Sequence, residues 1–334
     1  MEEIISLSYG NGGKKTYKLI NELLIPNIGN DILNSLGDGA SLRMNSSDIC
    51  FSTDSFVIDP YIFPGGDIGK LSVCGTINDL VMCGSIPKFL SLSFILEEGF
   101  LLSHLELVIK SIADTVNKLG VLVVTGDTKV VDRGHGHGIY INTSGIGEKI
   151  PSLNLSEKRI AKGDKVILTG ACGNHGIAIL CAREELLESN ITSDCMPLID
   201  ILNVVQKYGE SVKIMRDPTR GGIATTLNEF VENIEYSIEL QEELIPIDDN
   251  VKNACDLLGL DPLYSANEGK ALIVVSEEKA EAFLKDLREI HSFKDASIIG
   301  QVVDYTKSKV ILQNPLGGKR ILDKLSYDLL PRIC

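Results

Sequence analysis

Hydrophobic and polar positions in the first half of the chain alternate between a helical and a strand pattern. Between Asp67 and Gly84, apolar residues recur every three or four positions, which predicts a helix with Asp67 as its N-cap and Gly84 as its stop. A second helix is predicted from a capping box at Ser103 to a stop at Gly120. Apolar and β-branched runs predict strands at 49–58, 87–96, 121–124 and 139–146.

The second half repeats this rhythm after a polar connection between Pro151 and Gly163, where we place the domain boundary. Strands are predicted at 165–169, 212–215, 236–240, 271–275 and 296–302, and helices after Asn174-His175-Gly176, after Gly221-Gly222, and at 249–258 and 277–290. The predicted fold class is therefore α/β (α+β), with two α/β domains. We expect a glycine-rich segment at 1–40, domains at 41–150 and 151–324, and a mobile tail at 325–334.

Composition and charge narrow the class of protein. Of the 334 residues, 44% are hydrophobic and 23% are charged, which is typical of a globular protein. Apolar runs such as 121–124 are far too short to span a bilayer, and the acidic start Met1-Glu2-Glu3 is unlike a signal peptide, so we expect a soluble cytoplasmic protein with no membrane partner. A net charge of −14 opposes binding to the phosphate backbone of a nucleic acid and favours binding to a basic protein partner.

The chain ends in a cysteine. None of the eight cysteines forms a C-x-x-C pair, and the first seven are expected to be buried structural thiols, most within apolar patterns. Cys334 differs, because Pro331 restricts the backbone shortly before it, which makes the tail a short, semi-rigid arm that carries a thiol. A prenylation signal would need the cysteine four residues from the end, so the sequence does not match one. The alternative interpretation is an ordinary frayed terminus that happens to end in cysteine.

Several carboxylates stand where an isolated charge is costly. Asp54 lies inside an apolar strand pattern, and Asp79 lies in the last turn of a helix, where it opposes the macrodipole. Asp127 and Lys129 follow the strand at 121–124 in a glycine turn, at the strand end where α/β folds bind ligands. Each aspartate alone could be a turn residue, but their convergence favours a cation or ligand site.

Two further segments could bind anions. The loop with Gly12 and Gly13, followed by two lysines, can turn backbone N–H groups toward a phosphate, although it is not a Walker A loop and a flexible linker is equally compatible. Arg216 and Arg220 precede the helix after Gly221-Gly222, whose free N–H groups would add to an anion site. The position of Glu268, just before a strand, does not by itself distinguish a turn from a functional residue.

A set of motifs in a fixed order resembles the HypE family of hydrogenase maturation proteins, the carbamoyl dehydratases of the aminoimidazole ribonucleotide synthetase-like superfamily. The resemblance covers essentially the whole chain and rests on these segments: Phe51-Ser52-Thr53-Asp54-Ser55, Phe63-Pro64-Gly65-Gly66-Asp67-Ile68-Gly69-Lys70-Leu71, Gly75-Thr76-Ile77-Asn78-Asp79-Leu80, Thr125-Gly126-Asp127-Thr128-Lys129-Val130-Val131, Asp217-Pro218-Thr219-Arg220-Gly221-Gly222, Ala266-Asn267-Glu268-Gly269-Lys270 and Pro331-Arg332-Ile333-Cys334. It implies a homodimer formed by N-terminal domains that bind Mg-ATP.

The resemblance also implies a reaction. The carbamoyltransferase HypF would load a carboxamide onto Cys334, and ATP-dependent dehydration would convert it to a thiocyanate, which gives the cyanide ligand of the [NiFe]-hydrogenase iron by way of the HypC-HypD complex. Within that implied reaction, carboxylates suit Mg²⁺, Lys129 would offset phosphoryl charge, and Glu268 is the candidate base. The candidate metal ligands are Asp38, Asp54, Asp79 and Asp127, and the secondary phosphate contacts are Gly12, Gly13 and Arg220.

Tyr9 and Asn174 depart from the family pattern, which often has His and Asp at these positions.

Two other interpretations of the function remain open. One is a selenophosphate synthetase, although no cysteine precedes Cys50 to supply that family's glycine-loop nucleophile. The other is a non-catalytic carrier that only presents Cys334 to its partners.

Overall fold

The computed structural model describes residues 3–37, 39–184, 190–304 and 308–325, and these form two compact units. The N-terminal unit holds residues up to Leu80 together with Ser85–Lys149. The C-terminal unit holds Val81–Gly84 and the described residues from Ile150 to Leu325. Both units combine sheets with helices, so the predicted α/β class is confirmed.

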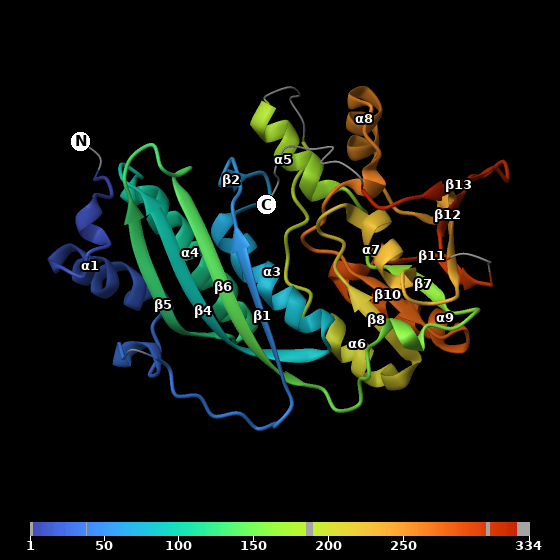
Figure 1. Ribbon diagram of the computed structural model, residues 1–334, viewed down its shortest axis with the longest axis horizontal. Coiled ribbons are helices and arrows are strands. Elements are labelled where there is room, and N and C mark those ends of the chain that lie inside the picture. Colours follow the sequence, from blue (N-terminus) through green and yellow to red (C-terminus); the bar gives the residue numbers. More distant parts are fainter. Residues whose placement is uncertain (1–2, 38, 185–189, 305–307, 326–334) are drawn as a thin grey trace. The chain divides into compact units, whose positions relative to one another are not determined.

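The N-terminal unit is built on a four-stranded sheet of order β1-β6-β4-β5 (Figure 1). Its strands are β1 (Ile49–Phe56), β4 (Ser85–Glu97), β5 (Leu122–Val131) and β6 (Ile139–Lys149), and a small ribbon pairs β2 (Ile62–Phe63) with β3 (Gly66–Asp67). β4 and β5 run parallel, because the helix α4 (Leu102–Leu119) crosses between them, and the other pairs are antiparallel. The predicted strands at 49–58, 87–96 and 139–146 are confirmed.

Helices α3 (Ile68–Met82) and α4 cover one face of this sheet (Figure 1). Thr76 of α3 shares a hydrogen bond of 2.6 Å with Thr143 of β6, and a side chain at Gly145 would collide with Thr76 and Leu80. The odd-numbered residues of β6 therefore face the helices. Near β5, the chain forms three short consecutive helical segments, α1 (Lys14–Lys18), η2 (Leu19–Leu24) and α2 (Ile25–Ile28).

Asp67 caps α3, as the sequence predicts. Its Oδ1 accepts hydrogen bonds from the backbone N–H groups of Gly69 at 2.7 Å and Lys70 at 3.2 Å. Burial raises the pKa of the Asp67 carboxyl, and the hydrogen bonds only partly oppose this shift. Because the folded pKa lies above the unfolded one, the contribution of this group to stability is present at acidic pH and is lost as pH rises through the folded pKa.

This geometry predicts opposite behaviour for two substitutions of Asp67. Asp67→Ala removes the acceptor and should lower the free energy of unfolding by about 1 kcal/mol. Asp67→Asn keeps an acceptor and removes the buried charge, so it should be as stable as the parent at neutral pH. Denaturant unfolding at pH 7 measures both variants, and an Asn variant as unstable as the Ala variant would contradict the cap.

Two sequence predictions fail in this unit. The capping box at Ser103 does not form, because α4 begins at Leu102 and its N-cap is Leu101, which offers no side-chain acceptor. The glycine turn after residue 124 is instead strand, because β5 continues through Val131 alongside β4. Gly126 allows this continuation, since any side chain there would meet the carbonyl oxygen of Leu92 on β4 at 2.3 Å.

The C-terminal unit contains a seven-stranded sheet of order β13-β12-β9-β11-β7-β10-β8, which is antiparallel except where β12 pairs with β9. Its strands are β7 (Lys165–Leu168), β8 (Val212–Arg216), β9 (Ser237–Gln241), β10 (Leu272–Val275), β11 (Ser297–Val303), β12 (Val310–Gln313) and β13 (Lys319–Leu322). The hairpin of β12 and β13 is absent from the sequence prediction. The other five strands were predicted and are confirmed.

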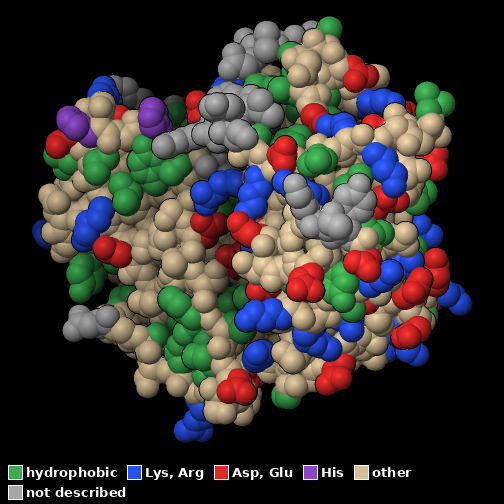
Figure 2. All heavy atoms as spheres, turned by 45° about the vertical axis from the view of Figure 1, so that its right-hand side comes forward, with side chains coloured by type: hydrophobic (Ala, Val, Ile, Leu, Met, Phe, Trp, Pro, Cys, Tyr) green, Lys and Arg blue, Asp and Glu red, His purple; other side chains and the backbone are tan. Residues whose placement is uncertain are grey.

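The helices of this unit are α5 (Asn174–Glu184), α6 (Ile201–Tyr208), α7 (Gly222–Val231), α8 (Asp249–Leu258) and α9 (Glu277–Arg288). Apolar residues of α7, including Ile223 and Phe230, pack with Leu168 and Leu272 of the sheet in the main core. A smaller core joins α5 and α8 through Ile177 and other buried side chains. On the face shown in Figure 2, Lys and Arg side chains are interspersed with Asp and Glu side chains. None of the helices in the described part of the chain has the length and apolar character needed to cross a membrane.

Candidate active site

A cavity of about 210 Å³ lies at the β5 edge of the N-terminal unit. Its apolar part comes from the helical segments of residues 20–36 and from Val123. Its polar part brings together Gly12 and Thr16 of the N-terminal segment with Asp127 and Lys129 of β5. Two segments that are more than 100 residues apart in the sequence therefore line one cavity, and three of the sequence-predicted site residues lie on it.

The glycine loop is held against β5 by its neighbours. Tyr9 is buried, and its hydroxyl donates a hydrogen bond of 2.7 Å to Oε1 of Glu3, while the ammonium of Lys15 lies 5.1 Å from the centre of its ring. Burial raises the pKa of Tyr9 to about 12, and the bond to Glu3 adds to the shift. At Gly10 the loop approaches β5 so closely that a side chain would meet the backbone nitrogen of Val130 at 2.6 Å.

Asp127 and Lys129 form an exposed ion pair, with Lys129 Nζ 3.4 Å from Asp127 Oδ1. Because they are two positions apart on one strand, both side chains leave the sheet on the same face. An exposed pair of this kind contributes little to stability. Both groups are thus accessible to an incoming ligand, with a cation and a carboxylate side by side.

Asp54 on β1 and Asp79 on α3 lie at the edge of the sheet opposite β5. Asp79 of α3 accepts a hydrogen bond of 2.6 Å from the hydroxyl of Ser52 on β1, and Asp54 follows two residues later on the same face. In the order β1-β6-β4-β5, three strand spacings separate β1 from β5, which is about 14 Å. Within the described residues, no three His, Cys, Asp or Glu side chains come together as a metal site.

Glu268 lies in the C-terminal unit, in a bend just before β10, and it is 4% exposed. The preceding residue anchors the bend, because Asn267 accepts a hydrogen bond of 2.7 Å from the Gly173 N–H and donates one of 3.0 Å to the Pro218 carbonyl. On the other side, the Glu268 N–H donates to Asp194 at 3.1 Å. The carboxylate is therefore carried by a backbone that is fixed on both sides.

The predicted anion site before α7 is only partly assembled. Arg216 ends β8 and pairs with Glu229 of α7 at 2.5 Å, so its charge is already matched by a carboxylate. Arg220 is exposed just ahead of the helix.

In the N-terminal glycine loop, Gly13 is exposed and is the N-cap of α1.

Known proteins resemble this chain over its whole length. The family model of the AIR synthase related protein N-terminal domain matches residues 36–148, and that of the C-terminal domain matches residues 161–313. The carbamoyl dehydratase HypE of Azotobacter vinelandii is 42% identical over 99% of this chain and 97% of its own. The chain belongs to the HypE family of hydrogenase maturation proteins.

Solved HypE structures share the fold. A crystal structure of HypE in complex with ATP superimposes with a TM-score of 0.94 at 42% identity, covering 98% of this chain and 99% of that one. The HypE chain of a HypE-HypF complex superimposes with a TM-score of 0.81 at 42% identity, covering 92% and 99%. The family membership expected from the motifs is thereby confirmed.

Two predicted site residues of this HypE-family chain, Asp38 and Cys334, lie outside the described residues. Conversely, sequence reasoning missed Thr16, whose hydroxyl accepts a hydrogen bond of 3.0 Å from the Gly12 N–H in the cavity. A threonine three positions after a glycine pair was the available signal. Sequence reasoning also missed Asp194, which comes from a segment without regular structure and so had no periodic pattern to mark it.

Proposed function

We propose that this protein is an ATP-dependent carbamoyl dehydratase that converts an S-carboxamide on Cys334 into a thiocyanate, the precursor of a hydrogenase cyanide ligand. The observation that carries the proposal is the cavity at β5, where a glycine loop, a carboxylate and an ammonium meet beside an apolar pocket. An apolar pocket with a few polar groups at one end suits a nucleotide, whose base is flat and whose phosphates are charged. The relatives named carbamoyl dehydratase and the ATP complex of a HypE protein support it.

The reaction separates into two steps for the residues of this chain. The carboxamide oxygen on Cys334 attacks the γ-phosphorus of ATP, and ADP leaves with the electron pair of the broken P–O bond. Lys129 stabilises the negative charge that develops on the phosphoryl group or on the carboxamide oxygen. The nitrogen then loses its protons, the C–O bond breaks, and phosphate leaves the carbon as the S–C≡N group forms. Glu268 accepts a proton in this second step.

The carboxylates of this chain fit the donor preference of Mg²⁺, which takes one or two carboxylates together with phosphate oxygens. The candidates to hold the ion are Asp54 and Asp79 at the β1 edge, Asp127 at the β5 edge, and Asp38, and within one copy the two edges would be separate positions for it. When bound, Mg²⁺ neutralises charge on the phosphates. The two positions to test are Asp127, which is exposed and paired with Lys129, and Asp79, which is hydrogen-bonded to Ser52.

Removing these charges should weaken nucleotide binding without unfolding the protein. Asp127→Asn and Asp79→Asn are nearly isosteric changes that remove a full negative charge, so Mg-ATP affinity should fall about tenfold or more in each. Asp114→Asn, an exposed change on α4, is the matched control and should bind normally. Calorimetric titration with Mg-ATP measures all three variants, and unchanged affinity in both test variants would contradict the assignment.

A homodimer would form through the open face of the sheet, which suits a second copy and carries Asp127, whereas Asp54 lies on the face that α3 covers. In register across β1, β6, β4 and β5 this face carries one apolar row, Phe51, Ile146, Phe89 and Leu122. Two polar rows follow it: Thr53, Ser144, Ser91 and Thr125 in one, and Ser55, Asn142, Ser93 and Asp127 in the other. Phe51 is 66% exposed, which is unusual for a large aromatic side chain unless another surface covers it.

HypF is the proposed donor of the carboxamide, supported by the solved HypE-HypF complex, and the HypC-HypD complex is the proposed acceptor of the cyanide. The decisive experiment measures phosphate release from ATP with and without a carbamoylated tail. We expect turnover only with the loaded tail. Turnover that is equal without it, or absent in both cases, would favour a different ATP enzyme or a non-catalytic carrier.

A further inference from the structure

The bend that carries Glu268 packs directly against the backbone of the segment 193–196. The two segments approach so closely that any side chain at Gly269 would meet the carbonyl oxygen of Asp194 at 1.9 Å. The Met196 N–H donates a hydrogen bond of 3.3 Å to the Glu268 carbonyl. Glycine at position 269 is therefore required for this contact, and the contact fixes the two segments relative to each other.

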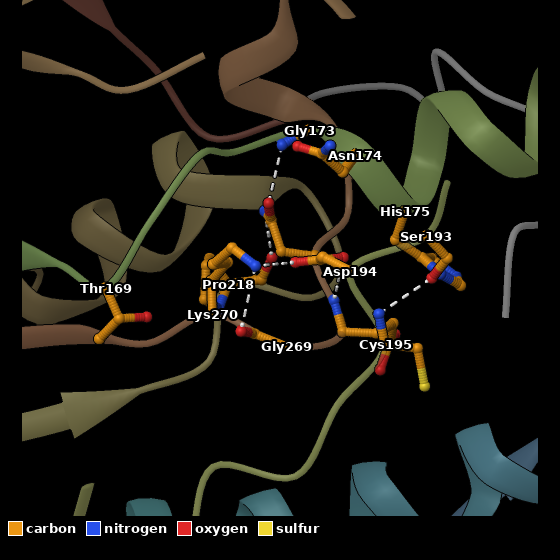
Figure 3. A network of polar contacts seen from close by, with 12 residues as sticks. Thr169, Gly173, Asn174, His175, Ser193, Asp194, Cys195, Pro218, Gly269 and Lys270 are labelled. Atoms are coloured by element: carbon orange, nitrogen blue, oxygen red, sulfur yellow. Dashed lines mark hydrogen bonds and ion pairs between the residues drawn. The ribbon is translucent and has the colours of Figure 1, made fainter. Parts of the chain in front are cut away.

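Asp194 uses its two carboxylate oxygens to bridge the ends of this bend. Its Oδ1 accepts the Glu268 N–H at 3.1 Å, and its Oδ2 lies 3.2 Å from the ammonium of Lys270. Lys270 Nζ also donates to the Gly269 carbonyl at 3.3 Å. Figure 3 shows Lys270 and Asp194 pointing toward each other at the centre of this polar network.

The ion pair between Asp194 and Lys270 is buried, with side chains 5% and 12% exposed. A buried ion pair is a weak way to stabilise a fold, because the cost of removing both charges from water offsets most of their attraction. Such a pair is better suited to holding one geometry, since separating the partners would strand a buried charge. Here the geometry that it holds is that of residues 268–270.

We infer that Asp194 and Lys270 are positioning residues for Glu268, and that their ion pair fixes the bend so that the Glu268 carboxylate is held ready to accept a proton. The inference rests on the proposed dehydration, in which Glu268 is the base. Neither Asp194 nor Lys270 takes part in bond making. They act through the two peptide groups between Glu268 and Lys270, whose placement sets that of the carboxylate.

The test compares single-turnover conversion of the carbamoylated full-length protein, followed by mass analysis of the C-terminal peptide, with ATP affinity. Lys270→Met should slow nitrile formation by about 10²-fold, the typical cost of displacing a catalytic group by about 1 Å, while ATP affinity stays near the parent value. Asp194→Asn, which keeps one oxygen for the Glu268 N–H but loses the charge, should slow it less. Lys270→Arg restores the charge and should recover part of the rate.

The matched control is Lys165→Met, which removes another lysine of the same unit and breaks its 3.0 Å ion pair with Glu277. This variant should form the nitrile at the parent rate. Thermal unfolding of every variant sets an assay temperature below all midpoints, and if Lys270→Met does not fold, Asp194→Asn decides the question. Parent-like rates in the folded Asp194→Asn and Lys270→Met variants would overturn the inference. Absence of nitrile formation in the parent protein would instead refute the proposed function.

Discussion

Cys334→Ala is expected to abolish cyanide formation while ATP binding survives. The thiol carries the carboxamide through a covalent bond, so no other contact can replace it. Formation of S-cyanocysteine should fall below detection, whereas the β5 cavity that we propose for the nucleotide is built from other residues and should bind ATP as before. Mass analysis of the tail and calorimetric titration with ATP measure the two properties separately.

Cys83→Ala is the matched control for this variant, because Cys83 is an exposed thiol, contrary to the burial expected from the sequence, and has no proposed role. It should keep full activity. A Cys334→Ala protein that still dehydrated a carboxamide on another residue would contradict the tethered arm.

Lys129→Ala should slow phosphoryl transfer by about 10²-fold or more. In the proposed mechanism, the substitution removes a positive charge from the place where the transition state gathers negative charge, and electrostatic contacts of this kind make large contributions to rate. Its ion pair with Asp127 is exposed, so loss of the pair should change stability little. Rapid-quench measurement of ADP formation with the carbamoylated protein tests this prediction.

Glu268→Gln should affect the later step. Glutamine keeps the size and the hydrogen bonding of the side chain but cannot take up a proton, so nitrile formation should slow while ATP affinity stays nearly intact. ADP formation should stay closer to the parent rate than nitrile formation does. Dehydration at the parent rate by Glu268→Gln would exclude Glu268 as the base, with a neutral Lys129 as the next candidate.

Periodic elements were the most predictable part of the fold. The helix from Asp67 to Gly84 follows from a helical repeat with a cap and a stop, and both its cap and its ending are present. β5 was predicted too short, because Gly126 and polar residues look like a turn in a single sequence. In the fold these residues continue a ladder with β4, and only the close approach at Leu92 explains the glycine.

The candidate site was less predictable, because its geometry depends on contacts between distant segments. Asp127 and Lys129 could be singled out as polar residues after an apolar run, and the resemblance to the HypE family suggested the proposed role of Glu268. The sequence could not reveal that Asp194 bridges the Glu268 bend, since the two are 74 residues apart and Asp194 lies in an irregular segment. Nor could it place β1 and β5 at opposite edges of one sheet.

The most direct test of the account is the intact mass of the C-terminal peptide after incubation with ATP, carbamoyl phosphate and the partner carbamoyltransferase. We expect a carbamoylated peptide that loses one water in the presence of ATP and stays unchanged when ATP is omitted. A peptide that is carbamoylated but never loses water, with the nucleotide bound, would contradict the assignment of dehydration to this protein.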